Sequence, residues 1–153
     1  MSIKEKLASL GLTLPTAAAP VAAYVPAVKS GNLVFTAGQL PVVDGKLVKE
    51  GKVGAEISAE DAKELAQLCA LNALAAISLV AELDQIERVV RVGGFVNCAP
   101  GFIAIPGVVN GASELLIEIF GDMRGKHART AVGVAGLPLN ASVEIELIVQ
   151  LKY

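Results

Sequence analysis

Polar and apolar residues repeat with a helical period most clearly over residues 58–83. Ser58 stands at the start of this segment as a capping residue, and Asp61 follows at the third position of a capping box. Acidic residues crowd the first turn, where they interact favourably with the helix dipole. The pattern predicts a long helix. Its second half, residues 65–83, is rich in Ala and Leu but includes polar residues, so a buried helix is favoured over a membrane span.

Two shorter segments also have a helical pattern. Residues 2–11 place Ile3, Leu7 and Leu10 on one stripe and end at Gly11, which predicts a short N-terminal helix. The stretch "GVVNGASELLIEIFGD", which follows a proline, predicts another helix that ends near Gly121. The letters "MRGKHA" then predict a loop.

The remaining apolar segments have the character of strands. The stretch "YVPAVKSGNLVFTAGQLPV" consists of two extended runs joined by a turn composition at residues 29–32, which predicts a hairpin. Asp44-Gly45 marks a second turn. Residues 85–100 are rich in β-branched residues and include Gly93-Gly94, which indicates a strand with a bulge or a close backbone approach. Two further strands are predicted at residues 128–135 and 141–151.

This order of elements predicts an α+β fold in which a mixed sheet is packed on one face by two helices. The other face also carries Val and Ile, so we expect it to be covered by a partner subunit. A chain of 153 residues suits a single domain, taken as residues 1–153 with an N-terminal extension at residues 1–20.

Charge and composition narrow the classes of function. The formal net charge is -2 and there is no basic stripe, so nucleic acid is not expected as a partner. The N-terminus "MSIKEKLASLGLTLP" lacks the apolar run of a signal peptide, and we expect no membrane association. Cys69 and Cys98 lie in apolar segments and suggest free thiols, which favours the cytoplasm.

One arginine lies at the start of an apolar strand. Arg129 shares a strand side with Ala131 and Gly133, and such small neighbours predict a recess in which the guanidinium binds a small carboxylic acid. The alternative is an ordinary ion pair with Glu144 or Glu146, or a contact across an oligomer interface.

The register of the last two strands decides between these interpretations. These strands are predicted to form a hairpin, and if its register pairs Ala135 with Ser142, Arg129 and both glutamates, Glu144 and Glu146, lie on the same face of the sheet. Another register separates them.

Other chemistry has little support in the sequence. His127 is the only histidine and stands in the predicted loop, where we expect it to be solvated. With one histidine and two separated cysteines, no metal site and no zinc ligand set are expected.

Two regions carry a specific resemblance to a known family. The hairpin "YVPAVKSGNLVFTAGQLPV" and the closing run "ARTAVGVAGLPLNASVEIELIV" resemble the signature regions of the Rid family, the reactive intermediate deaminases, also called YjgF or L-PSP endoribonuclease-like proteins. The similarity extends from about Tyr24 to the C-terminus. It implies a chorismate-mutase-like α+β fold and a homotrimer with a site in each of three clefts between subunits.

The resemblance also implies an activity and a set of site residues. Similar proteins with the arginine hydrolyse enamines and imines such as 2-aminoacrylate to 2-oxo acids and ammonia, without a metal or bound cofactor. Arg129 matches the arginine that holds the substrate carboxylate, and Glu144 matches the glutamate that orients the attacking water. The other positions that match the cleft are Tyr24, Asn110 and the backbone near Gly38 and Ala131.

Departures from the family pattern leave alternatives open. Ala37 replaces the family serine before the "GQ" step, and Ala131 replaces a cysteine, which together with the N-terminal extension indicates a divergent subfamily. We therefore expect a cytoplasmic homotrimeric imine deaminase. The first alternative is a non-catalytic protein that binds 2-oxo acids or other small carboxylates on the same scaffold. The second is an endoribonuclease, as the older family name suggests.

Overall fold

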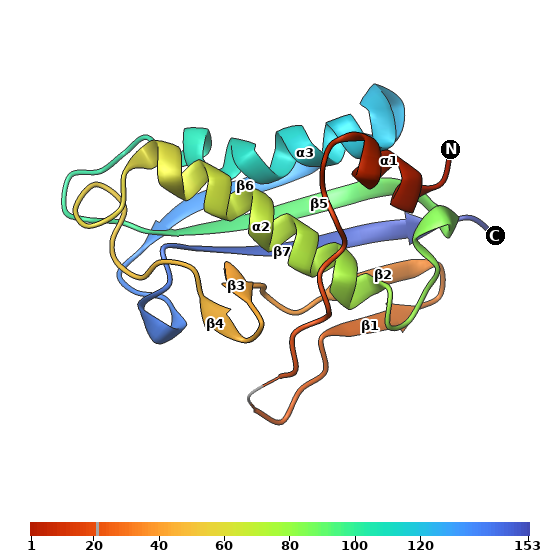
Figure 1. The fold of residues 1–153 in the computed structure, drawn as a ribbon, viewed down its shortest axis with the longest axis horizontal. Coiled ribbons are helices and arrows are strands. Elements are labelled where there is room, and N and C mark those ends of the chain that lie inside the picture. The colour runs from red at the N-terminus through yellow and green to blue at the C-terminus, as the bar shows by residue number, and fades with distance from the viewer. Residues whose placement is uncertain (21) are drawn as a thin grey trace.

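The computed structural model describes residues 1–20 and 22–153. Its main feature is a five-stranded sheet, in the order β1-β2-β7-β5-β6, with two long helices on one face (Figure 1). The helices are α1 (Ile3–Ser9), α2 (Ala59–Ile77) and α3 (Ile105–Gly125), and the strands of the large sheet are β1 (Ala27–Ser30), β2 (Leu33–Thr36), β5 (Ile86–Asn97), β6 (Ala128–Val134) and β7 (Val143–Leu151). A small sheet pairs β3 (Val42–Val43) with β4 (Lys46–Leu47). The predicted α+β architecture is therefore confirmed.

The helix starts follow the predicted local signals. The Ser58 hydroxyl accepts a hydrogen bond from the backbone N–H of Asp61, as expected for the N-cap residue that precedes a helix. Helix α2 ends at Ile77 rather than at residue 83, and a short 3₁₀ helix at Leu83–Gln85 leads into β5. The early end is consistent with Ser78, whose hydroxyl donates to the Ala75 carbonyl.

The N-terminal helix packs into the domain. Ile3 and Leu7 are buried, and the backbone N–H of Ile3 donates to the Asp84 carboxylate at 2.7 Å. Gly11 ends the segment with a φ of +73°, a left-handed conformation that glycine adopts without steric cost. The predicted short helix and its stop are therefore confirmed.

Both predicted turns form hairpins. Strands β1 and β2 pair antiparallel with Ser30 opposite Leu33, which leaves a two-residue loop at residues 31–32. Asp44 and Gly45 both have positive φ, at +51° and +78°, between β3 and β4. This conformation suits the right-handed twist of the strands that it joins.

The predicted hairpin between residues 128–135 and 141–151 is wrong. Strand β5 lies between these two strands, parallel to β6 and antiparallel to β7. Parallel strands require a crossover connection, and α3 supplies it between β5 and β6. Residues 91–97 of β5 pair with β6 and residues 86–96 pair with β7, so β6 becomes an edge strand and no Ala135–Ser142 pair forms.

The glycine pair in β5 permits close approach rather than a bulge. A Cβ on Gly94 would lie 2.5 Å from a methyl of Val109 in α3, and a Cβ on Gly93 would lie 2.7 Å from the Glu146 side chain. The register irregularities of β5 occur earlier, between Ile86 and Arg91. Helix α3 therefore sits directly on the strand at Gly94.

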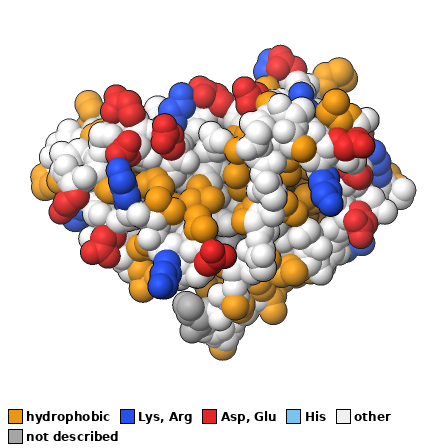
Figure 2. Space-filling view, in the orientation of Figure 1, with side chains coloured by type: hydrophobic (Ala, Val, Ile, Leu, Met, Phe, Trp, Pro, Cys, Tyr) orange, Lys and Arg blue, Asp and Glu red, His pale blue; other side chains and the backbone are white. Residues whose placement is uncertain are grey.

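The helices fill one face of the sheet and leave the other open. The exposed apolar side chains of the open face include Val28, Phe35 and Val132, each at least 39% exposed. On the helix-bearing side, Figure 2 shows acidic and basic side chains of both signs mixed around the edge of the view, without a basic stripe. Within residues 1–20 and 22–153, no helix has the length and hydropathy needed to cross a bilayer.

The closest approach between α2 and α3 predicts a position at which an added side chain strongly destabilises the fold. A Cβ on Gly111 of α3 would lie 1.9 Å from the Lys63 carbonyl oxygen of α2. Because this atom belongs to the backbone, Gly111→Ala must push the helices apart, and we expect it to lower the free energy of unfolding by about 3 kcal/mol. Urea denaturation at fixed protein concentration measures this loss.

Gly107→Ala is the matched control on the same helix. A Cβ at Gly107 meets nothing within 4 Å. Alanine has the higher helix propensity, so this variant should be neutral or more stable by up to about 1 kcal/mol. Equal stability of the two variants would show that the helices separate at little cost.

Candidate functional site

Arg129 lies on the helix-covered face of the sheet. Residues paired across neighbouring strands point to the same face, and Val92 of β5 pairs with Arg129 on one side and with the buried Leu147 on the other. Strand β6 is the edge strand beside α3, so the Arg129 side chain reaches α3 rather than β7. The site around Arg129 is therefore formed by β6 and α3.

Two side chains of α3 hold the Arg129 guanidinium. Its Nη1 atom donates to Asn110 Oδ1 at 2.7 Å and to Ser113 Oγ at 3.3 Å. Asn110 and Ser113 are three residues apart and therefore face the same way on the helix. No hydrogen bond from Nε or Nη2 of Arg129 is found to any residue in the described part of the chain.

His127 extends this cluster, so the prediction of a solvated loop histidine is wrong. Its Nε2 lies 2.9 Å from Ser113 Oγ, and its Nδ1 lies 2.6 Å from the Gly125 carbonyl oxygen. Burial lowers the pKa of His127 below its ordinary value, against the opposing effect of the Gly125 carbonyl, and the Arg129 charge lowers it further. The neutral imidazole is therefore favoured at neutral pH.

The small residues beside Arg129 serve packing. A Cβ on Gly133 would lie 3.0 Å from Cys98 Sγ and 3.0 Å from the end of Ile105, and Ala131 packs against the core. The absence of a side chain at Gly133 lets Ile105 of α3 and Cys98, which follows β5, lie close to this strand. The recess along Ala131 and Gly133 stays a prediction.

Glu144 lies on the opposite face of the sheet. It pairs with Phe95, whose other partner is the exposed Val132 of the open face. The Glu144 carboxyl packs against Gly38, where a Cβ would lie only 2.7 Å from its Cδ. Glycine at position 38 therefore makes room for this carboxyl group.

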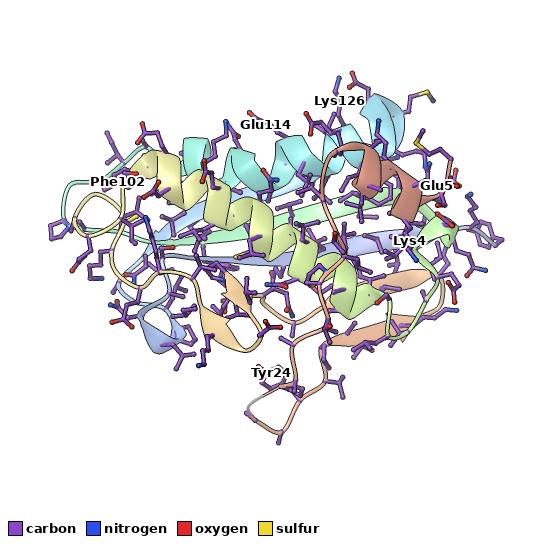
Figure 3. All side chains as sticks on the ribbon, viewed as in Figure 1. Lys4, Glu5, Tyr24, Phe102, Glu114 and Lys126 are labelled. Atoms are coloured by element: carbon purple, nitrogen blue, oxygen red, sulfur yellow. The ribbon has the colours of Figure 1, made fainter. Side chains whose placement is uncertain are left out.

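A recess of about 470 Å³ opens beside Glu144. Its walls are mainly apolar, and Tyr24 and the buried Gln39 supply polar groups there in addition to the glutamate. Tyr24 is 49% exposed and stands on the loop before β1, far from α3, where Glu114 is marked (Figure 3). The N-terminal segment contributes residues 18–20 to the same wall.

The environment of Glu144 favours its protonated form more than water does. Burial raises the pKa of Glu144 above its ordinary value, and the nearby Glu146 charge adds to this effect. A carboxyl group whose pKa is moved toward neutrality can both accept and donate a proton.

The predicted site residues thus form two clusters within one chain. Arg129, Asn110 and Ala131 lie on the helix side, and Tyr24, Gly38 and Glu144 lie around the recess. The hairpin register that placed Arg129 and Glu144 on one face is wrong, because β5 lies between their strands.

The alternative of an ion pair finds no support. The ion pairs among residues 1–20 and 22–153 are Lys49–Asp61, Lys63–Glu114 and Lys126–Asp122, and none includes Arg129. In the same part of the chain, no three His, Cys, Asp or Glu side chains are arranged to hold a metal ion.

The sequence contained a signal for the two residues that were missed. Ser113 follows Asn110 by three positions on a helix, and His127 precedes Arg129 by two positions, the strand period that places side chains on one side. Both spacings place these side chains beside a residue already matched to the cleft. Without the pairing of β6 with β5, however, nothing indicated that α3 covers this strand.

The fold and these clusters define an α+β protein with a hydrogen-bonded arginine on one face of its sheet and a carboxyl group in a recess on the other face. Comparisons with known proteins identify the family. The family model described as "YjgF/chorismate mutase-like, putative endoribonuclease" matches residues 4–151. Since that match includes nearly the whole chain, this protein belongs to the YjgF/chorismate mutase-like family.

Relatives match over nearly their full length. Protein TCP17 of Trypanosoma cruzi is 40% identical over 151 residues, which cover 98% of this chain and 94% of that protein. The crystal structure of Atu1372 from Agrobacterium tumefaciens has 44% identity and a TM-score of 0.89, and covers 99% of this chain and 94% of that one. A Shewanella oneidensis MR-1 structure described as a putative endoribonuclease has 33% identity and a TM-score of 0.94. The match covers 99% of this chain and 100% of that chain.

The lowered pKa of His127 predicts a dependence of stability on pH. The unfolded chain binds a proton at His127 near pH 6.5, whereas the folded chain binds it only at lower pH. The stability contribution is therefore complete above pH 6.5 and declines as the pH falls from 6.5 toward the folded pKa. We expect wild type to lose more stability between pH 7.5 and 5.5 than His127→Gln, which stays neutral.

Urea midpoints of both proteins at the two pH values measure this difference. The raised pKa of Glu144 acts in the opposite direction, since its contribution is lost as the pH rises, but it is common to both proteins and cancels. The same pH dependence in both proteins would mean that His127 titrates as it does in water.

Proposed function

We propose that this protein is an enamine/imine deaminase that hydrolyses intermediates of the 2-aminoacrylate type to 2-oxo acids and ammonia. The observation that carries the proposal is the Arg129 guanidinium, which is held at Nη1 by Asn110 and Ser113 while its Nε and Nη2 side makes no hydrogen bond within the described residues. That side of a guanidinium matches the two oxygens of a carboxylate. Membership of the YjgF family and the match of Arg129 to the family arginine support this role.

The chemistry requires few groups. The enamine first tautomerises to an imine, whose C2 is electrophilic. Water adds to C2 and gives up one proton as the nitrogen takes up one, which gives a carbinolamine. The carbinolamine hydroxyl then gives up its proton, the nitrogen takes up a second proton and the C–N bond breaks, so that imine and water give 2-oxo acid and ammonia. Glu144, with its raised pKa, is proposed to take the proton from water and return one to nitrogen. Arg129 holds the substrate carboxylate so that C2 lies near this water.

We propose that the complete site forms between subunits of a homotrimer. Arg129 and Glu144 lie on opposite faces of the sheet, so one chain does not bring them to the same substrate. The open face carries exposed Val28, Phe35 and Val132, and apolar patches of this kind are typical of subunit interfaces. In the trimer, the partner subunit's Arg129 would face the recess that contains Tyr24, Gly38 and Glu144.

The location proposed for this chemistry is the cytoplasm. Cys69 and Cys98 are both free thiols, which is compatible with a reducing compartment. Reactive imines also arise where pyridoxal-phosphate enzymes act, and the resemblance to Rid proteins supports a location beside them. The partners proposed are small-molecule imines or 2-oxo acids.

Two substitutions test the roles of the charged residues. Arg129→Ala removes a charge-assisted hydrogen-bond pair and should lower kcat/KM by roughly 10- to 100-fold. Glu144→Gln keeps the shape of the side chain but transfers no proton, and should lower kcat by about 100-fold or more. The assay generates 2-aminoacrylate in situ with a dehydratase and follows pyruvate release in competition with trapping by semicarbazide.

The same assay contains its controls. Glu146→Gln changes the neighbouring carboxylate and should keep most of the activity. A wild-type protein that releases no pyruvate, yet binds 2-oxo acids, would replace the deaminase with a non-catalytic carboxylate-binding protein. RNA cleavage that survives Arg129→Ala would favour an endoribonuclease.

Mixed trimers test the subunit arrangement. Arg129→Ala and Glu144→Gln chains, each expected to be at least about 10-fold less active alone, are unfolded together, refolded and assayed. If each site takes Arg129 from one chain and Glu144 from another, random mixing restores both groups in about a quarter of the sites, and activity returns to about that fraction of wild type.

Light scattering should give a trimer for each sample. If the two groups act within one chain, mixing restores no activity. A monomeric wild-type protein that hydrolyses imines would also contradict the proposed arrangement.

A further inference from the structure

The hydrogen bonds behind Arg129 form a chain with a defined direction. A carbonyl oxygen only accepts hydrogen bonds, so the contact of 2.6 Å between His127 Nδ1 and the Gly125 oxygen requires the proton on Nδ1. In the neutral ring, Nε2 then carries a lone pair. Ser113, whose Oγ lies 2.9 Å away, must donate its hydroxyl proton to that nitrogen.

This direction determines what Ser113 offers to Arg129. With its proton directed to His127, the Ser113 oxygen presents its lone pairs to Arg129 Nη1 at 3.3 Å. Without an acceptor at His127, the hydroxyl proton would rotate among other directions, including those that face the guanidinium. His127 thereby keeps Ser113 an acceptor, although no contact between His127 and Arg129 is needed.

The same chain determines which side of the guanidinium is presented to a ligand. Asn110 and Ser113 both engage Nη1, and the group is planar and rigid. Fixing Nη1 at two points therefore fixes the direction of the Nε and Nη2 pair. An arginine side chain has up to about 2 kcal/mol of rotamer entropy, and holding it before the ligand arrives removes part of that cost from binding.

We propose that Ser113 and His127 are positioning residues for the Arg129 anchor, and that His127 acts only through the Ser113 hydroxyl. Ser113 is 9% exposed and His127 is half-buried behind it, so neither is assigned a contact with the ligand. The inference rests on Arg129 as the carboxylate anchor. That role is common to the proposed deaminase and to a non-catalytic binding protein.

The first test uses pyruvate as the probe, with binding measured by calorimetry or NMR titration at pH 8, where His127 is neutral. Ser113→Ala and His127→Leu should each raise the Kd about 3- to 10-fold, the range of one neutral hydrogen bond. The double variant should bind no more weakly than Ser113→Ala alone. His127→Gln, whose amide oxygen can accept from Ser113, should bind nearly as well as wild type.

Two outcomes of these binding measurements on the single and double variants would overturn the proposal. If the effects of Ser113→Ala and His127→Leu multiply in the double variant, the two residues act independently. If His127→Gln binds as poorly as His127→Leu, the acceptor at Nε2 is not what matters. Circular dichroism and light scattering for each variant confirm that the fold and assembly are retained.

A second measurement needs no variant. His127 is the only histidine of the chain, so the imidazole nitrogen resonances of the ¹⁵N-labelled wild-type protein are assigned without mutagenesis. We expect a protonated Nδ1 and an unprotonated Nε2 at pH 8. A proton on Nε2 would reverse the direction of the chain and overturn the proposal.

These experiments separate the inference from the proposed activity. Pyruvate binding requires no turnover, so a protein that shows the expected coupling but hydrolyses no imine loses the deaminase assignment and keeps the positioning role. A protein that hydrolyses imines while Ser113→Ala and His127→Leu leave pyruvate binding and KM unchanged loses the positioning role alone. If Arg129→Ala binds pyruvate as wild type does, the anchor itself is wrong and both proposals fail.

Discussion

The site depends on the position of β5 between β6 and β7. Its residues 91–97 pair with β6 and its residues 86–96 pair with β7, and this double pairing fixes the face on which each side chain of β6 and β7 lies. Arg129 is thereby directed to the helices and Glu144 to the open face. A slip of one residue in either pairing would exchange these faces and place charge in the core. Burial of the apolar side chains on the helix-covered face therefore specifies the register.

The two charged residues are accommodated in different ways. Arg129 is partly buried beside α3. Its guanidinium hydrogen-bonds to Asn110 and Ser113, and Ser113 also hydrogen-bonds to His127. Such a network is stable when each member has a partner. Glu144 instead lies in a mainly apolar recess beside Gly38, and burial raises its pKa. One cluster thus fixes a permanent charge, whereas the other leaves a carboxyl group able to exchange protons.

The N-terminal segment is part of the domain and of the recess. The sequence resemblance began at Tyr24, but the family model begins at residue 4 and the two related crystal structures cover 99% of this chain. The physical basis is visible in α1, where Ile3 and Leu7 are buried. Residues 18–20 then return to the wall beside Glu144. The segment therefore has a structural role in shaping the recess, and its sequence belongs to the family pattern.

The sequence by itself determined the local elements, because their signals act over a few residues. Ser58 and Asp61 start α2, Gly11 ends the N-terminal segment, and Asp44-Gly45 forms a tight turn. The α+β class followed from the order of these elements, and the matches of Arg129 and Glu144 followed from family motifs. These inferences need no knowledge of which strands are neighbours.

Only the tertiary structure decided how the strands pair and what surrounds each candidate residue. Chain order suggested that the last two strands form a hairpin, yet β5 separates them, because strand pairing is set by burial of the whole sheet rather than by proximity in sequence. For the same reason His127 became a half-buried partner of Ser113 rather than a solvated residue. The environment of a side chain depends on segments far away in the chain, and that dependence is what local patterns leave undetermined.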